Sequence, residues 1–202
     1  MTVSELSVRL KNACAEVKAA EAELTEIDSH FGDADHGLTM CKICAAIEDA
    51  AGANAEGSVH DMLEAAADAV MCLNGGSAVP LWNTWLDGMA EAAPDAGEVD
   101  VAGLKDIFAH ALEELDDMSG AKVGDKTMMD ALIPASEAIA AYAGDNEAEL
   151  FTLAANAAVN GAENSRNFVS KFGRAKSYGA KTIGTPDAGA VSMSKFFVGL
   201  AK

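Results

Sequence analysis

The chain has 202 residues, of which 50% are hydrophobic and 5% aromatic, and 32 acidic against 14 basic side chains give a formal net charge of -18. A surface this acidic repels nucleic acid and anionic membranes, so we expect binding to neither. The sequence has no apolar run of ~20 residues and no signal-peptide pattern, which predicts a cytoplasmic protein without a membrane span. The length suits one domain over residues 1–202.

Abundant alanine and the lack of alternating apolar patterns predict an all-α fold. Apolar residues recur at spacings of three, four and seven, as in helices with one buried face. The expected helices are 4–28, 37–51, 59–73, 78–92, 101–118, one that starts at Asp125, 145–163 and one from Gly189 to the end. The sequence therefore predicts eight helices.

Two of the four cysteines form a C-x-x-C pair, Cys41 and Cys44, which is compatible with a zinc or redox site. No second C-x-x-C, histidine pair or βαβ pattern accompanies it. A three-residue spacing on a helix also suits two small core residues. We therefore expect Cys14, Cys41, Cys44 and Cys72 to be buried, reduced thiols.

The segment 166–187 has little apolar periodicity and is interrupted by three glycines and a proline. Connections of this length in compact helical domains are uncommon and are usually functional or disordered. Its basic residues are Arg166, Lys171, Arg174, Lys176 and Lys181, and no acidic residue occurs from 164 to 186. This concentration of positive charge favours a phosphate site, and a solvated flexible segment is the alternative.

Three aspartates lie close together in the sequence around the end of the first predicted helix. Asp28 would occupy its last turn, and Asp33 and Asp35 the following loop, so their side chains can converge. Magnesium prefers such carboxylate oxygens and keeps water and phosphate oxygens as its other ligands. Asp-rich loops also serve as turns and helix caps, so spacing alone leaves both interpretations open. The run lacks the pattern of an EF-hand.

Two predicted helix starts can accept an anion. Residues 36–39 would form the first turn of the second helix, where free backbone N–H groups favour phosphate. His36 could donate to a phosphate oxygen or cap the loop. The pair Gly75-Gly76 precedes another helix and permits close backbone approach, although many such pairs are only turns. The run 124–128, by itself, fits a helix cap.

Together these segments resemble the nucleotide-binding L subunit (DhaL) of dihydroxyacetone kinases. The matching motifs are Gly-Asp-Ala-Asp-His-Gly at 32–37, Gly-Gly at 75–76, Gly-Asp-Lys-Thr-Met at 124–128, Gly-Arg-Ala at 173–175, Ser-Tyr at 177–178, Ile-Gly at 183–184, Asp187 and Gly-Ala at 189–190. They occur in the family's order across nearly the whole chain. The resemblance implies an antiparallel, up-and-down barrel of eight helices with the nucleotide site at one end, in agreement with the helices predicted above.

The resemblance also implies a ligand set. Asp28, Asp33 and Asp35 would hold two magnesium ions that bridge the phosphates of ADP or ATP, and Arg174 and His36 would be the catalytic residues, with Arg174 reaching a phosphate. The implied nucleotide-binding residues are His36, Gly37, Leu38, Thr39, Gly76, Ser77, Ala78, Gly120, Thr127, Met128, Arg174, Asp187, Ala188 and Gly189. Within this set, the run 75–81 departs from the family's Gly-Gly-x-Ser-Gly-Pro-Leu, because its serine comes one position early and Val79 replaces a glycine.

The family places the hydroxyketone, such as dihydroxyacetone, on a separate K subunit. The chain would then be half of an enzyme, a homodimer or part of a heterocomplex, supplied with phosphate by ATP or by a phosphotransferase-system phosphocarrier. Three alternatives remain open. They are a kinase of the same fold for another ketose or a fatty acid, a nucleotide-loaded partner of a transcription regulator, and a helical scaffold with acidic loops.

Overall fold

Nine α-helices and no β-strand build the chain in a computed structural model that describes residues 1–202. The α-helices are α1 (Val3–Ala19), α2 (Glu21–Ser29), α3 (His36–Ala53), α4 (Val59–Met71), α5 (Ala78–Ala92), α6 (Val101–Ser119), α7 (Met129–Ala141), α8 (Glu147–Asn164) and α9 (Ala188–Leu200). Two 3-10 helices, η1 (Ser165–Asn167) and η2 (Arg174–Thr182), lie between α8 and α9. The all-α prediction is confirmed.

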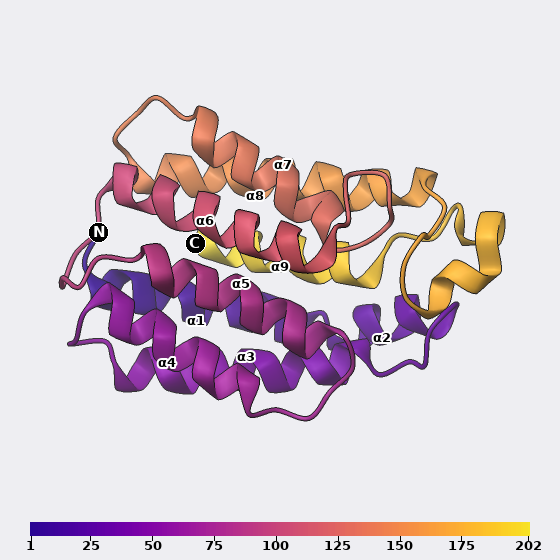
Figure 1. Cartoon of the computed structure of the whole chain (residues 1–202), viewed down its shortest axis with the longest axis horizontal. Helices are drawn as coiled ribbons and strands as arrows, with labels where there is room; N and C mark the ends of the chain where they lie inside the picture. Colours follow the sequence, from indigo (N-terminus) through magenta and orange to yellow (C-terminus); the bar gives the residue numbers. More distant parts are fainter.

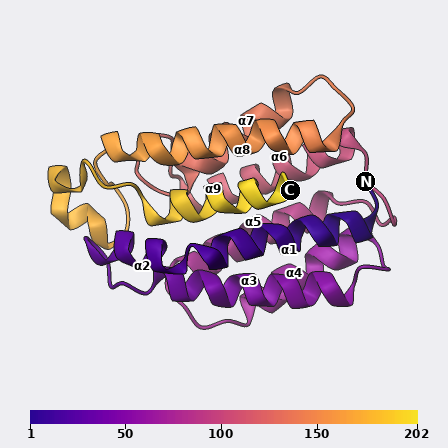
Figure 2. The same ribbon diagram turned by 180° about the vertical axis from the view of Figure 1, so that it is seen from behind.

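The long α-helices run up and down along the long axis of the molecule, with α9 among the others and α2 at one end (Figure 1). The view from behind shows α9 between α8 and α1, so the last helix closes the bundle against the first (Figure 2). Aromatic side chains fill the centre: the ring centroids of Trp85 and Phe196 are 5.6 Å apart, and neither residue is exposed. None of the helices combines the length and hydropathy that a membrane crossing needs.

The predicted first helix is divided in two. It begins after Thr2 and not at Ser4. The Thr2 hydroxyl accepts the Glu5 N–H and the Glu5 carboxylate accepts the Thr2 N–H, so the two residues form a capping box. It breaks at Ala20 (φ -92°, ψ 8°), and α2 continues to Ser29 at the end of the bundle. The prediction of one continuous helix is wrong because the break has no glycine or proline to mark it and leaves the apolar periodicity unchanged.

The helix α7 begins at Met129, four residues after the predicted start at Asp125. The Asp125 carboxylate is not a helix cap: it accepts the Lys122 N–H (2.8 Å) and pairs with Lys171 Nζ (2.6 Å). Positive φ angles at Gly124 (96°) and Lys126 (61°) bend the chain into a turn before the helix. Residues 122–128 therefore form a structured turn.

The cysteine prediction is correct in part. All four thiols are free, and Cys14 and Cys44 are buried. Cys41 is half-buried, and its Sγ lies 3.5 Å from Glu21 Oε2. Cys72 is exposed, because it follows the last residue of α4 at the bundle end. No pattern in the sequence marked this residue as lying beyond the helix.

The glycine-rich segment 166–187, which we call the basic loop, is folded over the end of the bundle beside α2 (Figure 1). The Gly184 N–H donates to the Arg166 carbonyl (2.8 Å), which brings the two ends of the loop together. Tyr178 of η2 packs against Phe31, with ring centroids 5.1 Å apart. The loop is thus attached to the part of the chain that carries the three aspartates.

Candidate functional site

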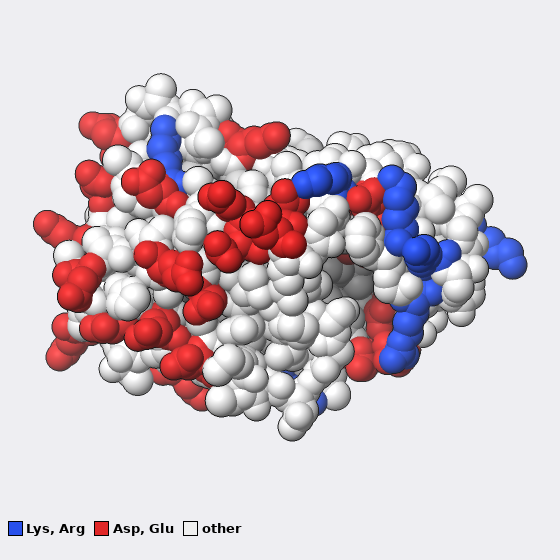
Figure 3. Space-filling view, viewed as in Figure 1, with Lys and Arg blue, Asp and Glu red and all other residues white.

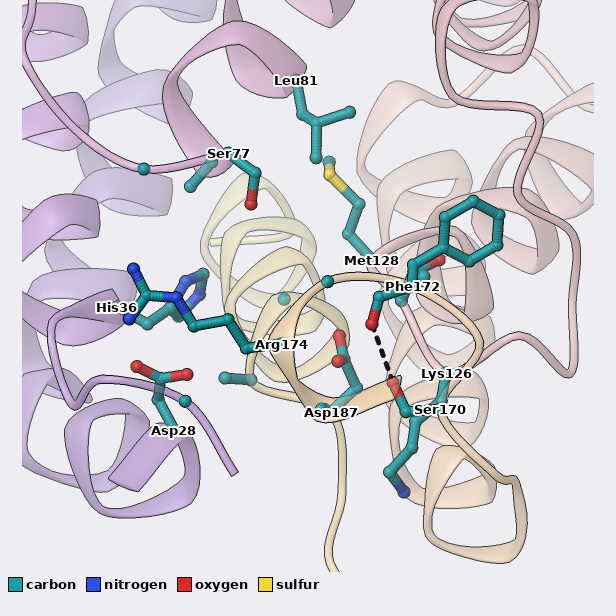
Figure 4. A pocket seen from close by; sticks show the side chains of 18 of the residues that line it. Asp28, His36, Ser77, Leu81, Lys126, Met128, Ser170, Phe172, Arg174 and Asp187 are labelled. Atoms are coloured by element: carbon teal, nitrogen blue, oxygen red, sulfur yellow. Dashed lines mark hydrogen bonds between the residues drawn. The ribbon is translucent and has the colours of Figure 1, made fainter. Parts of the chain in front are cut away.

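A cavity of about 420 Å³ opens at this end of the bundle. Its wall comes from separate parts of the chain: the end of α2 with the loop to α3 and the start of α3, the start of α5, the end of α6, the turn before α7, the basic loop and the start of α9. Figure 4 shows that polar side chains, including Asp28, His36 and Arg174, lie on one side of it, and Leu81, Met128 and Phe172 on another. The cavity is therefore divided into a charged region and an apolar region.

The charged region is built around the three aspartates. Asp28, Asp33 and Asp35 each place a carboxylate oxygen within 4.8 Å of the other two. The Asp35 N–H donates to Asp28 Oδ2 (3.2 Å), which fixes the loop against the helix end. A Cβ at Gly32 would lie 2.0 Å from Asp28 Oδ1, so only glycine leaves room for this carboxylate. Three hard oxygen donors thus share one small volume.

A positive charge faces this cluster from the basic loop. Arg174 Nη1 lies 2.5 Å from Asp33 Oδ2, and the Arg174 side chain is 69% exposed. Lysines and arginines gather over this end of the molecule, whereas acidic side chains are concentrated on the other half of the face in view (Figure 3). A negatively charged ligand with bound cations would find both signs of charge here, in an otherwise repelling protein.

His36 is in the first turn of α3 and joins that helix to α9. Its Nε2 lies 3.1 Å from Ser192 Oγ, and the Ser192 hydroxyl donates to the Gly189 carbonyl (2.9 Å). The hydroxyl oxygen therefore accepts from a protonated Nε2. Burial lowers the pKa of His36 below its ordinary value, although the carboxylates of Asp28 and Asp35 act in the opposite direction. The hydrogen bond to Ser192 orients the ring at the cavity wall.

The apolar region contains residues that sequence reasoning mostly missed. Leu81, Trp82 and Phe172 line the cavity together with the predicted Met128. Trp82 is 1% exposed and also packs in the core against Phe196. A tryptophan or leucine inside a regular apolar stripe reads as a core residue, so no local signal separated these side chains from the rest of α5.

The start of α5 borders the cavity with Gly76, Ser77 and Ala78. Val79, which replaces the family's glycine, does not line it: the side chain is 7% exposed and packs over Gly75, where a Cβ would meet Val79 Cγ2 at 2.5 Å. The Val79 side chain therefore points into the core, and Ser77, the serine that comes one position early, lines the cavity.

The start of α9 forms the opposite wall with Asp187, Ala188 and Gly189. The Asp187 carboxylate caps the helix by accepting the Ala190 N–H (2.8 Å). The surrounding protein withdraws this carboxyl from water and raises its pKa to about 7, and the nearby Asp130 carboxylate acts in the same direction. Asp187 therefore titrates near neutral pH, unlike an ordinary aspartate.

Thr39 and Thr127 also line the cavity, but three residues in the implied set do not. Gly37 is packed against α2, Leu38 is 53% exposed, and Gly120 ends α6 in the left-handed conformation (φ 62°). A buried residue outside the implied set, Lys126, lines the wall next to Thr127. Its position was hidden in a motif that resembles a helix cap.

Comparison with known proteins supports the resemblance found in the motifs. The model of the DAK2 domain family matches residues 30–202. The chain is 36% identical to a D-erythrulose kinase of Mycolicibacterium smegmatis over 200 residues, which cover 95% of this chain and 34% of that protein. It is 27% identical to the PEP-dependent dihydroxyacetone kinase, ADP-binding subunit DhaL, of Escherichia coli, over 89% of this chain and 87% of that one.

A solved structure has the same fold. The crystal structure of the dihydroxyacetone kinase from C. freundii in complex with AMP-PNP and Mg2+ superposes with a TM-score of 0.72 at 22% identity, covering 97% of this chain and 33% of that one. The chain thus spans about a third of the length of that kinase and of the erythrulose kinase. With a family model that covers most of its residues, this chain belongs to the DAK2 domain family.

Proposed function

We propose that this chain binds a magnesium complex of ADP or ATP in the cavity and is the nucleotide-binding part of a kinase that phosphorylates a small hydroxyketone. One observation carries the proposal: the carboxylates of Asp28, Asp33 and Asp35 lie within 4.8 Å of one another, with the Arg174 guanidinium beside them. Paired metal ions and an arginine are what phosphoryl transfer needs, because it depends on positioning and on neutralisation of phosphate charge.

The residues present fit magnesium. All donors in the cluster are carboxylate oxygens, the ligand type that magnesium prefers, and the exposed Asp33 and Asp35 leave room for water and phosphate oxygens. Without cations the three negative charges would repel one another, because Arg174 pairs with Asp33 alone. We propose two ions at this cluster, which when bound supply charge neutralisation to the phosphates.

The other parts of the cavity then have roles in nucleotide binding. The first turn of α3 presents free backbone N–H groups next to the cluster, where a phosphate is favoured. Arg174 can donate to a phosphate oxygen from the opposite side, and His36 lines the same region. Leu81, Met128 and Phe172 offer an apolar surface for the nucleobase. Arg174 and His36 are the proposed catalytic residues.

The hydroxyketone is proposed to come from a partner. The E. coli relative is named an ADP-binding subunit and is matched over most of its length, which supports assembly with another subunit. We propose a heterocomplex with a K subunit in the cytoplasm. The relative's name also gives PEP dependence, so a phosphocarrier is a candidate phosphate source beside ATP. The 36% identity to a D-erythrulose kinase favours a second candidate substrate, a four-carbon ketose in place of dihydroxyacetone.

Calorimetric titration with ADP and with ATP, each with and without magnesium, tests the nucleotide site. We expect binding that depends on magnesium, and no binding under any condition would contradict the proposal. Addition of a K subunit with dihydroxyacetone or D-erythrulose, and of ATP or a phosphorylated carrier, then identifies the acceptor and the donor by which pair yields the ketose phosphate.

A further inference from the structure

Lys126 is a buried cation for which nucleotide binding gives no immediate reason. It is 4% exposed, and its ammonium forms no ion pair with any carboxylate. Burial lowers its pKa, whereas the negative charges of Asp187 and Asp130 act to raise it. Its φ of 61° lies in the left-handed region that lysine rarely adopts. A buried charge in a strained backbone is costly, and such strain is concentrated at functional sites.

The ammonium is directed at the ends of the basic loop. Lys126 Nζ donates to the Ser165 carbonyl (2.6 Å), immediately before the loop, and to the Thr185 carbonyl (2.5 Å) near its end. Figure 4 shows the side chain running away from Asp28 and Arg174, so its charge does not point at the carboxylate cluster. Because one nitrogen contacts both carbonyls, the loop ends cannot separate without breaking a hydrogen bond to a charged donor.

The turn that carries Lys126 is itself held in place. The buried Asp130 carboxylate accepts the N–H groups of Gly124 (2.6 Å) and Thr127 (2.7 Å), which brace the turn on both sides of Lys126. The neighbouring Asp125 makes a second attachment, because its carbonyl accepts the Lys171 N–H at 3.1 Å. The turn is therefore a fixed base from which the loop extends to Arg174.

We propose that Lys126 is a positioning residue: it joins the two ends of the basic loop and thereby holds Arg174 beside Asp33. The Arg174 side chain is mostly exposed and its ion pair is with Asp33, so its position depends on how the loop is anchored. The anchoring follows from the contacts alone. Its effect on nucleotide affinity rests on the proposed function.

Hydrogen exchange of the full chain without ligand tests the anchoring. In Lys126→Met, which keeps an unbranched side chain and removes its ammonium group, we expect peptides from 166–187 to exchange about tenfold faster, the effect of losing one charged hydrogen bond. The matched control is Lys122→Met in the same turn, where the lysine is exposed and pairs with Asp116. Equal exchange of the loop in both variants and wild type would overturn the proposal.

A double-mutant cycle of magnesium–ADP affinity tests the consequence for Arg174. We expect Arg174→Ala to weaken binding about 10- to 100-fold in wild type but less than about threefold in the Lys126→Met background, because its guanidinium is already misplaced there. If the two substitutions weaken binding by factors that simply multiply, the positioning role is overturned. A general loss of stability in Lys126→Met would also give multiplying factors, so it cannot imitate the expected result. Absence of binding in wild type would refute the proposed function instead, and the exchange experiment would still decide the anchoring.

If Lys126→Met does not fold, the wild-type protein still tests the contacts. The Nζ ammonium protons of Lys126 should be protected from water in nitrogen-15 NMR spectra, with couplings to the Ser165 and Thr185 carbonyl carbons. Ammonium protons of Lys126 that exchange as fast as those of the exposed Lys122 would overturn the proposal.

Discussion

Arg174 Nη1 lies 2.5 Å from Asp33 Oδ2 and thereby connects the basic loop to the loop that follows α2. Both side chains are substantially exposed, at 69% and 39%, and ion pairs in such positions contribute only about 0–1 kcal/mol to stability. The contact therefore explains little of why the chain folds. Its significance is its location, because it places a guanidinium at a cluster of three carboxylates on the rim of a cavity.

Replacement of Asp33 by alanine removes one of three converging carboxylates. We expect Asp33→Ala to abolish magnesium-dependent nucleotide binding in calorimetry while the helical circular dichroism is unchanged, because Asp33 is exposed in a loop. Asp87→Ala on the exposed face of α5 is the matched control and should bind like wild type. Equal affinity of Asp33→Ala and wild type would remove the metal assignment.

Replacement of Arg174 should affect the ligand more than the fold. Loss of a charged donor to phosphate is expected to weaken nucleotide binding and phosphoryl transfer about 10- to 100-fold, with a melting temperature close to that of wild type. Lys176→Ala, an exposed cation in the same loop, serves as control and should have a much smaller effect. Similar losses in the two variants would show that the loop acts only through its total charge.

The raised pKa of Asp187 predicts a pH-dependent stability. Its pKa is about 7 in the folded chain against an ordinary 3.8, so the folded state holds a proton that the unfolded state releases. The stabilising contribution is complete below about pH 3.8 and is lost as the pH rises through about 7. Asparagine in place of Asp187 can still cap the helix but has no carboxyl group to titrate, so it removes the pH dependence alone.

Thermal unfolding should therefore show that Asp187→Asn becomes more stable relative to wild type as the pH rises from 5 to 8. The expected change is on the order of 1 kcal/mol or more, since one pKa unit is about 1.4 kcal/mol. A difference in melting temperature between the two proteins that is the same at pH 5 and pH 8 would mean that Asp187 is ionised in the folded chain at both pH values, and that its pKa is not raised.

Gly37 is expected to matter for stability through helix packing. A Cβ at this position would lie 2.2 Å from the Glu21 carbonyl oxygen and 2.3 Å from Thr25 Oγ1, so α2 and α3 would have to separate. We expect Gly37→Ala to lower the free energy of unfolding by about 1–3 kcal/mol, as overpacking does. Gly76→Ala is the control for stability, because a Cβ there meets nothing within 4 Å. Chemical denaturation with equal midpoints for the two variants would contradict the packing argument.

Much of the helical framework could be predicted because its causes are local. The apolar stripes located most helices to within a few residues. The break at Ala20 and the late start of α7 were not predicted, because neither changes the apolar periodicity. Cys72 looked like a core residue for the same reason. It lies just past the end of α4, which only the observed helix boundary shows.

For the site, the sequence by itself determined the chemistry available: an aspartate run, a glycine-rich loop with the scarce cations, and motifs in the order of a known family. Tertiary structure alone decided which atoms meet. Residues far apart in the chain, such as Asp33 and Arg174, come together because helix packing brings α2 and the basic loop to the same end of the bundle. For the same reason, Trp82 and Lys126 became part of a cavity wall: burial and side-chain direction depend on neighbours from other helices, which no local pattern encodes.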